Sequence, residues 1–517
     1  MGLGRNFRRW GMLALIAVMV LSPHAASADT VTPDRITAAL SKLELLAEGV
    51  VKDGAVPGLA IGVVHGDEVV FLKGFGHREA GKPETVDADT VFQIASLSKP
   101  VSATIVAALV SEGFVSWDAK IADLDPAFRL SEPYPTSELT VRDLFSHRSG
   151  LPGTAGDDLE DIGYDRAEIL RRLRFVSPSS SFRAGYSYSN FGLTEGAVAA
   201  AKPTGKSWEE VAEEKLYQPL GMTSTSSRHA DFIKQANRAA LHVKIDGVWT
   251  ARVKRDPDAQ APAGGVSSTA RDLSQWVRLV LGNGVYAGET LIKADALDQT
   301  HVPLMERGQN PVSGGTSFYG LGWNVEFGRH GLSWGHAGAF SVGARTLVTL
   351  FPEEKLGIVI IANAFSTGVP EGLSESFADL AFDGKVEKDW VKAWDDTYAG
   401  LFGPAIAAAK ATYAPPSPAR PSGPDSAYAG RYFNDFIGDA VVSTAGGALV
   451  LKVGPAGARS YSLKHFDGDL FVTFPDAETP DAPSGISFVL GPNGKAAAMT
   501  IDFLDGNHLG TLARVGD

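Results

Sequence analysis

A Ser-x-x-Lys lies at the start of an apolar helix in the stretch Phe92-Gln-Ile-Ala-Ser96-Leu-Ser-Lys99-Pro100-Val-Ser-Ala-Thr-Ile-Val-Ala-Ala-Leu109. Residues three apart share a helix face, so the Ser96 hydroxyl and the Lys99 amine can meet without help from other segments. An amine in apolar surroundings loses proton affinity, because burial disfavours the charged form. A neutral amine beside a hydroxyl is the minimum equipment for covalent acyl transfer.

Two details of this stretch limit the interpretation. Pro100 cannot donate a hydrogen bond to the Ser96 carbonyl, which predicts a distorted first turn around the nucleophile. Ser-x-x-Lys by itself is a weak signal, and the alternative is an ordinary helix start with a capping serine and a solvated lysine.

Composition excludes several classes of protein. The chain has 517 residues, a formal net charge of −13 and no cysteine. The negative charge and the absence of a basic stripe argue against nucleic-acid binding. The lack of cysteine excludes disulfides, thiolate nucleophiles and cysteine zinc sites. The eleven histidines show no spacing typical of metal ligands, so no metal site is expected.

The first residues have the pattern of an export signal. Three arginines (Arg5, Arg8, Arg9) precede an apolar run, Trp10–Leu21, and small residues follow at Ala26-Ser-Ala28. This predicts a signal peptide over residues 1–28, cleaved near Ala28, and a periplasmic or secreted protein. The run is too short to span a bilayer comfortably, so no stable membrane span is expected in the mature form. An uncleaved anchor is the alternative, and the choice between Sec and twin-arginine export stays open.

Periodicity divides the chain into two domains of different class. It predicts a helix over 34–51, strands over 58–64, 69–72, 319–323, 344–350 and 356–361, and a mostly helical middle over 119–280. Strands at both ends of this region indicate an α/β unit whose ends pair, with a helical insertion. After a proline-rich linker, short alternating strands over 440–443, 448–453, 470–474, 486–490 and 499–503 predict an all-β domain of barrel or sandwich type.

The predicted boundaries are therefore residues 1–28 for the signal peptide, 29–412 for the first domain, 413–426 for the linker and 427–517 for the β domain. Three roles for the β domain remain open. It could cap the active site and restrict substrate size, drive formation of a homo-oligomer, or act as a stabilising appendage.

Two further segments offer chemistry. Tyr186-Ser-Tyr188-Ser-Asn190 carries a phenol that can relay a proton and an amide that can hold a carbonyl. Tyr188 is preferred to Tyr186, because only Tyr188 has an asparagine two residues later. In Trp334-Gly-His336-Ala-Gly338, a glycine at a strand edge lets a carbonyl approach backbone N–H groups. The alternatives are a polar loop with packed aromatic rings and an ordinary turn histidine.

In this order and separation, the three segments resemble the penicillin-recognising serine hydrolases: class C β-lactamases, D,D-peptidases, D-aminopeptidases and related esterases. The resemblance covers roughly residues 34–363 and implies a β-lactamase/transpeptidase-like antiparallel sheet flanked by helices, with a helical subdomain. The tail from Tyr428 resembles the lipocalin-like domain attached to some of these hydrolases. Further supporting segments are Leu144–Pro152, Tyr217–Met222, Ala263–Gly265 with Asp272-Leu273, and Tyr319–Trp323.

The resemblance implies a role for each motif residue. Ser96 attacks the carbonyl and forms an acyl-enzyme, and Lys99 and Tyr188 share the proton as general base and acid. The N–H groups of Ser96 and Ala339 form the oxyanion hole, and water then deacylates the enzyme. Substrate contacts fall to Asn190, His336 and Gly338. The substrate is a small molecule or a peptide, and no cofactor is needed.

One departure from the family pattern bears on the substrate. β-Lactamases and D,D-peptidases usually carry Lys-Thr-Gly or Lys-Ser-Gly where this chain has His336-Ala-Gly338. A histidine is mostly neutral near pH 7 and Ala337 supplies no hydroxyl, so weak β-lactam turnover is expected. The pattern favours hydrolysis of small amides or esters, as in the D-aminopeptidase and esterase branches. A true β-lactamase or D,D-carboxypeptidase, and an inactive penicillin-binding-type sensor, are the alternatives.

A rival nucleophile lies in Gly331-Leu-Ser333-Trp-Gly335, which matches the Gly-x-Ser-x-Gly elbow of α/β-hydrolases. That elbow needs a strand before the serine and a helix after it. Glycines and a β-branched run follow Gly335, so no helix is expected. His147 is interpreted as a residue that braces its loop rather than as a base.

Overall fold

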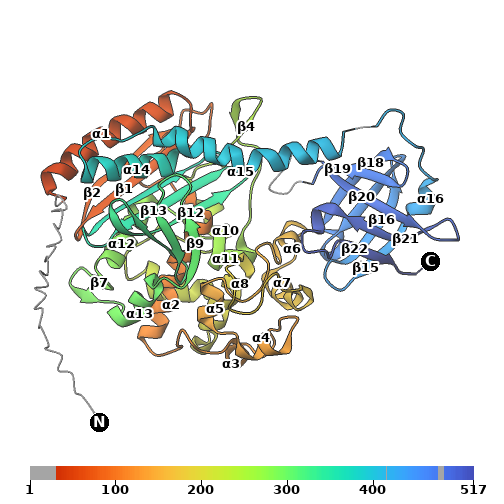
Figure 1. Cartoon of the computed structure of the whole chain (residues 1–517), viewed down its shortest axis with the longest axis horizontal. Coiled ribbons are helices and arrows are strands. Elements are labelled where there is room, and N and C mark those ends of the chain that lie inside the picture. Colours follow the sequence, from red (N-terminus) through yellow and green to blue (C-terminus); the bar gives the residue numbers. More distant parts are fainter. Residues whose placement is uncertain (1–30, 415, 476–482, 517) are drawn as a thin grey trace, which may run out of the picture.

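The computed structural model describes residues 31–414, 416–475 and 483–516. The predicted signal peptide of residues 1–28 lies outside these described residues. Within them, no helix combines the length and apolar character needed to cross a membrane. Figure 1 shows a large α/β body and a separate β domain, joined by a long helix.

An antiparallel sheet of eight strands forms the centre of the α/β body, in the order β2-β1-β14-β13-β12-β11-β10-β9. The pairing of β1 with β14 confirms that the two ends of this region meet. In a separate two-stranded pair, β3 (Phe92–Gln93) pairs with β6 (Ser267–Ser268). The strands of the large sheet are β1 (Gly58–His65), β2 (Glu68–Gly76), β9 (Met305–Gln309), β10 (Thr316–Tyr319), β11 (Asn324–Gly328), β12 (Gly331–Phe340), β13 (Ala344–Phe351) and β14 (Leu356–Ala362).

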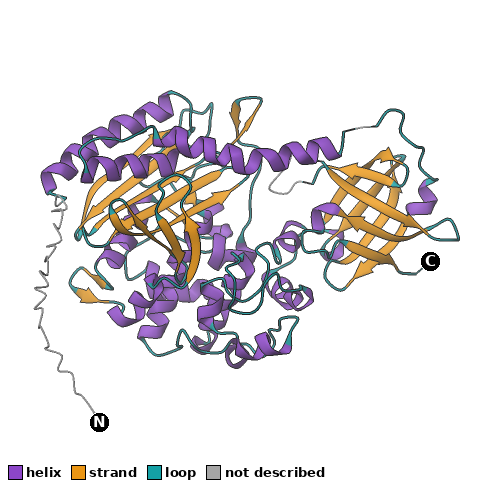
Figure 2. Cartoon of the chain, in the orientation of Figure 1, coloured by secondary structure: helices purple, strands orange, loops and turns teal. Residues whose placement is uncertain are grey.

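Helices cover both faces of the sheet, as Figure 2 shows. On one face, α1 and α14 bury an apolar cluster that includes Leu43, Ile360 and Phe377. On the other face, α12 and the helical region enclose a larger cluster built around α2 and α8. The helices of this body are α1 (Pro33–Lys52), α2 (Ser98–Ser111), α3 (Ile121–Leu124), α4 (Pro133–Glu138), α5 (Val141–Phe145), α6 (Asp157–Asp161), α7 (Arg166–Arg172), α8 (Asn190–Ala201), α9 (Trp208–Ala212), α10 (His229–Lys234), α11 (Ala261–Gly264), α12 (Ala270–Leu281), α13 (Ala294–Asp298), α14 (Val369–Phe382) and α15 (Trp390–Thr412).

The prediction of a strand over 319–323 is wrong. Tyr319 ends β10, and the next four residues form the turn into β11. Gly322 adopts a φ of +78°, and a Cβ there would lie 2.9 Å from the Lys99 carbonyl oxygen. The turn therefore packs directly against the start of α2, in a backbone conformation that glycine adopts readily.

After α16 (Asp425–Tyr428), the chain forms a closed antiparallel barrel. Its interior is filled by aromatic side chains, including Tyr428, Tyr432 and Phe488. The strand predicted over 499–503 lies earlier in the chain, because β21 begins at Ala496 and ends at Ile501, where a 3₁₀ turn follows. The barrel strands are β15 (Gly430–Asn434), β16 (Gly438–Ala445), β17 (Ala448–Val453), β18 (Arg459–Asp467), β19 (Leu470–Thr473), β20 (Ser484–Leu490), β21 (Ala496–Ile501) and β22 (Thr511–Arg514).

Candidate active site

Ser96 lies on a short 3₁₀ turn, Ala95–Leu97, that leads into α2. Ala95 has a φ of +48°, an uncommon conformation for a residue with a side chain. The Ser96 side chain is partly exposed, whereas its neighbours in the turn are buried. Pro100 is the third residue of α2, where its missing N–H costs little. The turn that carries Ser96 is 3₁₀ rather than α-helical, which agrees with the distortion predicted around the nucleophile.

Lys99 is fully buried below this turn. Its Nζ atom lies 3.1 Å from Ser96 Oγ, 2.7 Å from Asn190 Oδ1 and 2.9 Å from the Ala263 carbonyl oxygen. Burial lowers the pKa of Lys99 to about 7, against the opposing effect of the Asp157 carboxylate. Near neutral pH the amine can therefore act as a base, in contrast to a solvated lysine.

The start of α8 brings Tyr188 and Asn190 to Lys99. Ser189 caps the helix by accepting a hydrogen bond from the backbone N–H of Gly192. The Lys99 Nζ atom lies 4.5 Å from the centre of the Tyr188 ring. Burial raises the pKa of the Tyr188 hydroxyl, and a hydrogen bond with Ser96 acts in the opposite direction. The phenol is therefore neutral and can relay a proton.

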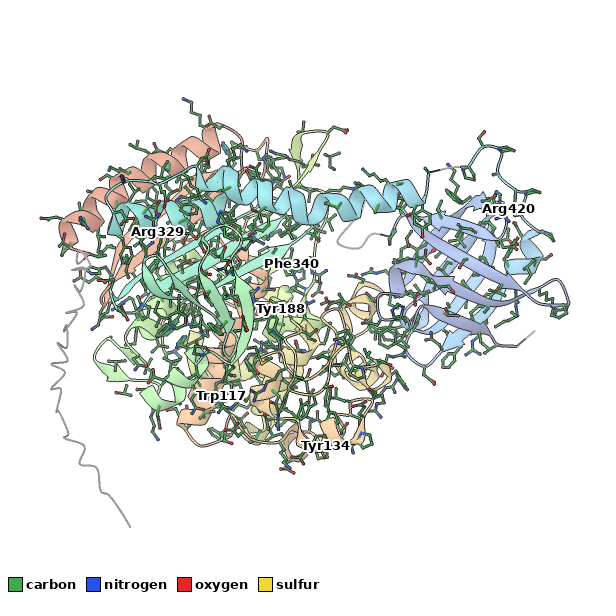
Figure 3. The ribbon with its side chains drawn as sticks, in the orientation of Figure 1. Trp117, Tyr134, Tyr188, Arg329, Phe340 and Arg420 are labelled. Carbon is green, nitrogen blue, oxygen red and sulfur yellow. The ribbon has the colours of Figure 1, made fainter. Side chains whose placement is uncertain are left out.

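The structure separates the two tyrosines of this segment. Tyr188 contacts Ser96 and Lys99, whereas Tyr186 packs against the rings of His147 and Tyr319. Figure 3 shows Tyr188 and Phe340 in the middle of the α/β body, where the sheet meets the helical region.

Strand β12 approaches Ser96 at Gly338. A Cβ on Gly338 would lie 2.3 Å from the Ile94 carbonyl oxygen and 2.4 Å from Thr346 Oγ1, so only glycine permits this packing. The pairing of β11 with β12 ends at Gly335, which leaves residues 336–340 unpaired on that side in the described sheet. This free edge includes Ala339, and β12 lies against the turn that carries Ser96.

His336 is buried behind this edge and is neutral. Its Nδ1 atom lies 2.6 Å from the Ala337 carbonyl oxygen and its Nε2 atom 3.0 Å from the Tyr319 hydroxyl. Nδ1 can therefore donate to the carbonyl while Nε2 accepts from the phenol. Burial and the nearby Lys99 lower the pKa of His336 to about 3. His336 thus orients its neighbours and supplies no positive charge for a substrate carboxylate.

His147 braces the loop before α8. Its Nδ1 atom accepts a hydrogen bond from the backbone N–H of Ser189 at 3.1 Å, and its ring packs against Tyr188. Burial and the nearby Lys99 lower its pKa well below the usual range, so it stays neutral. This geometry agrees with the bracing role expected from the sequence.

Two charged residues near the site were missed by sequence reasoning. Asp157 accepts hydrogen bonds from Asn190 Nδ2 at 3.3 Å on each carboxylate oxygen. The guanidinium of Arg307 lies 5.5 Å from the centre of the Tyr186 ring and is exposed. Neither residue belongs to one of the sequence motifs. No sequence pattern indicated that the backbone carbonyl of Ala263 would accept a hydrogen bond from Lys99.

The rival Ser333 does not lie on a nucleophile elbow. It is in the middle of β12, paired with Glu326 of β11. Strand β13 follows β12 where an elbow would require a helix.

One grouping of described residues could in principle hold a metal ion. His330, Asp379 and Asp383 place their ligand atoms within 4.8 Å of one another. Arg329 pairs with both carboxylates, so its guanidinium already neutralises the charge that a metal ion would balance. No such grouping includes Ser96 or its described neighbours.

Sequence similarity relates this chain to known proteins. Residues 43–380 match the family model described as Beta-lactamase, and residues 414–510 match a domain of unknown function, DUF3471. An unguisins hydrolase, ungD', of Aspergillus campestris is 27% identical over 407 residues, covering 73% of each chain. The D-alanyl-D-alanine-carboxypeptidase/endopeptidase AmpH of Escherichia coli (strain K12) is 24% identical over 381 residues, covering 71% of this chain and 94% of AmpH.

A solved structure shares the fold. The octameric penicillin-binding protein homologue from Pyrococcus abyssi superposes with a TM-score of 0.55 at 19% identity, covering 92% of this chain and all of that one. The family match extends over well more than half of the chain and includes each motif described above. This chain therefore belongs to the beta-lactamase family of serine hydrolases.

Proposed function

We propose that the protein hydrolyses amide or ester bonds of small peptide-like substrates through an acyl-enzyme on Ser96. The observation that carries this proposal is the 3.1 Å contact between Ser96 Oγ and Lys99 Nζ, in surroundings that hold the pKa of Lys99 near 7. Ser96 Oγ attacks the substrate carbonyl while its proton passes to Lys99 and Tyr188. The same pair returns the proton to the leaving amine or alcohol, and water then hydrolyses the acyl-enzyme.

The free edge of β12 supports an oxyanion hole made by the N–H groups of Ser96 and Ala339. Such a donor lowers the activation barrier by about 3 kcal/mol, because it stabilises the charge that develops on the carbonyl oxygen. Asn190 accepts a hydrogen bond from Lys99 through Oδ1. The two 3.3 Å contacts of its Nδ2 atom with the Asp157 carboxylate can share one amide hydrogen, which leaves the other to reach a substrate carbonyl.

The substrate class follows from the residues beside Gly338. A neutral His336 and the methyl group of Ala337 offer neither charge nor hydroxyl to a penicillin carboxylate. We therefore infer a D-aminopeptidase, peptidase or esterase activity, with weak turnover of β-lactams. The names of two relatives, a hydrolase and a carboxypeptidase/endopeptidase, support cleavage of peptide-like bonds. We further propose a location outside the cytoplasm, supported by the export pattern of residues 1–28.

Acylation mapping tests the nucleophile. We expect a fluorophosphonate probe to label Ser96 and a penicillin probe to label it slowly or not at all, as read by peptide mass spectrometry. Ser96→Ala removes the label, whereas Ser333→Ala retains it. Labelling at Ser333, or at neither serine, contradicts the proposal. Fast labelling by penicillin contradicts the proposed substrate class alone.

The activity has an expected dependence on pH. Because the neutral amine of Lys99 is the base, kcat/KM rises with pH and reaches half of its plateau near pH 7, where the amine loses its proton. A chromogenic ester assayed between pH 5 and 9 measures this profile. A profile that stays flat through this range is inconsistent with Lys99 as the base.

A further inference from the structure

The barrel rests on residues 154–172 of the α/β body, a segment that contains α6 and α7. The Tyr164 hydroxyl donates a hydrogen bond to the Ile437 carbonyl oxygen at 2.8 Å. Arg459 Nε donates to the Asp161 carbonyl oxygen at 2.9 Å. Figure 1 shows α6 and α7 on the side of the body that faces the barrel. Both bonds end on backbone carbonyls, so they fix the path of the chain on each side.

The backbones of the two domains also pack directly against each other. A Cβ on Gly454 of the barrel would lie 2.0 Å from the Ile162 carbonyl oxygen. Ile162 is fully buried in the same apolar cluster as Ile437 of the barrel. The apolar core therefore runs across the boundary between the domains, unlike the contact of a loosely tethered appendage.

The opposite side of α6 reaches the catalytic residues. Its first residue, Asp157, accepts both hydrogen bonds from Asn190 Nδ2, and Asn190 Oδ1 accepts from Lys99. The adjacent Asp158 is turned toward Asp505 and Gly506 of the barrel. Neighbouring residues of one short helix thus contact the active site and the barrel.

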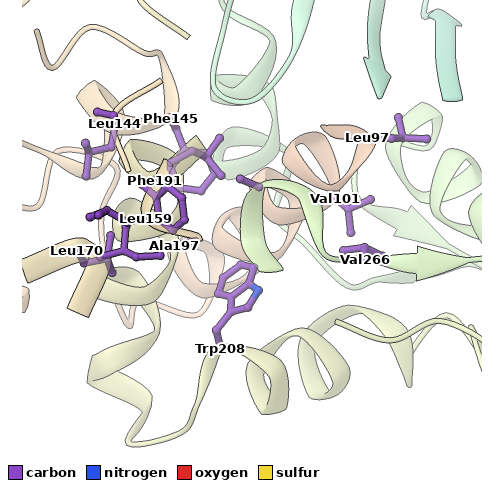
Figure 4. Close-up of a cluster of buried hydrophobic side chains, with 14 of the residues drawn as sticks. Leu97, Val101, Leu144, Phe145, Leu159, Leu170, Phe191, Ala197, Trp208 and Val266 are labelled. Atoms are coloured by element: carbon purple, nitrogen blue, oxygen red, sulfur yellow. The ribbon is translucent and has the colours of Figure 1, made fainter. Parts of the chain in front are cut away.

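Helix α6 cannot hold this position on its own. It has five residues, and its N-cap residue, Gly156, offers no side-chain cap. A helix this short is unstable in water unless tertiary contacts support it. Figure 4 shows one such support, the packing of Leu159 beside Phe191 of α8. The barrel contacts supply the support on the other side.

We propose that Asp157 is a positioning residue of the Ser96 site and that the docked barrel holds it in place. Asp157 fixes the Asn190 amide, and Asn190 in turn fixes the Lys99 amine beside Ser96. This inference rests on the proposed function, because it assigns the barrel a part in the same reaction. Groups that orient catalytic side chains in this way affect rate more than ground-state binding.

The first test uses Asp157→Asn in the full-length protein. This isosteric change keeps the size of the side chain but removes the charge and one acceptor for Asn190 Nδ2. We expect kcat to fall roughly 10- to 100-fold with little change in KM, as for a small misplacement of a catalytic group. Ester hydrolysis under saturating and limiting substrate measures the two parameters.

A purely structural role of Asp157 would leave the pH dependence of kcat/KM unchanged. The groups that face Lys99 are the neutral Tyr188, His147 and His336, together with the Asp157 carboxylate. Asp157 is the acid that raises the pKa of Lys99 against the effect of burial. We therefore expect the acid limb of kcat/KM to shift to lower pH in Asp157→Asn.

The second test loosens the barrel without touching the catalytic residues. Tyr164→Phe combined with Arg459→Ala removes both hydrogen bonds described above. Arg431→Ala is the matched control, since Arg431 pairs with Asp439 on the exposed surface of the barrel. In the double variant we expect faster hydrogen exchange in residues 157–163, a lower kcat and the same shift of the acid limb. Adding Asp157→Asn to it should lower kcat no further than Asp157→Asn alone.

Each outcome assigns success or failure to one claim. Faster exchange in residues 157–163 with an unchanged kcat and acid limb would overturn the role of the barrel. An unchanged kcat and acid limb in Asp157→Asn would overturn the role of Asp157. The proposed function fails separately, through loss of fluorophosphonate labelling at Ser96 in the unmodified protein.

Discussion

Replacing Lys99 by methionine is expected to lower the rate of Ser96 acylation by about 10³-fold, within the range typical of a lost general base. Methionine fills nearly the same buried volume but cannot accept the Ser96 proton. No neighbour replaces Lys99 as the base, because the Tyr188 phenol stays protonated and His147 and His336 contact other partners. Stopped-flow measurement of fluorophosphonate labelling gives the rate directly.

The control for this change is Lys215→Met. Lys215 is partly buried, but its Nζ atom pairs with Glu112 at 2.8 Å, and neither residue belongs to the site. This variant should acylate Ser96 at the normal rate. If Lys99→Met is labelled as fast as the unmodified protein, the base is another group and the mechanism must be reassigned.

Replacing Gly338 by alanine is expected to slow acylation by at least about 10²-fold, because it displaces reacting groups by a fraction of an ångström or more. The added methyl group would lie 2.3 Å from the Ile94 carbonyl oxygen and 2.4 Å from Thr346 Oγ1. Strand β12 must then move away from the nucleophile turn, and Ala339 moves with it. Overpacking of this kind also costs about 1–3 kcal/mol of folding free energy.

Gly49→Ala is the control for the added methyl group itself, since a Cβ at Gly49 has no heavy atom within 4 Å. Urea unfolding gives the free energy of each variant, and labelling gives the rate. A Gly338→Ala protein that keeps its acylation rate would show that the close approach of β12 is not needed for catalysis.

The sequence predicted those parts of the fold whose signal is local. Apolar residues at helical spacing predicted the first helix over 34–51, and α1 runs from Pro33 to Lys52. The flanking strands and the all-β tail were predicted in the same way, from periodicity. Residues 319–323 were assigned wrongly, because their apolar and aromatic side chains pack in a turn against α2, a contact that no local pattern encodes.

The strands that sequence reasoning missed in the barrel have the same explanation. Strand β18 (Arg459–Asp467) is highly polar, and its alternation is irregular at the bulge near His465. Its assignment depends on pairing with β17 and β19 rather than on its own residues. Closing the barrel requires β22 to pair with β15, which joins segments about 80 residues apart.

By itself, the sequence determined the pairing of Ser96 with Lys99, because a separation of three residues on a helical turn brings two side chains together whatever surrounds them. It also indicated Tyr188, Asn190, His336 and Gly338 through motifs in a fixed order. Only the tertiary structure decided the chemical state of these groups. The low pKa of Lys99 and of His336 comes from burial by segments distant in the chain. The contacts of Asp157 and of the barrel likewise arise from packing, which depends on the whole chain and leaves no mark on a local stretch of residues.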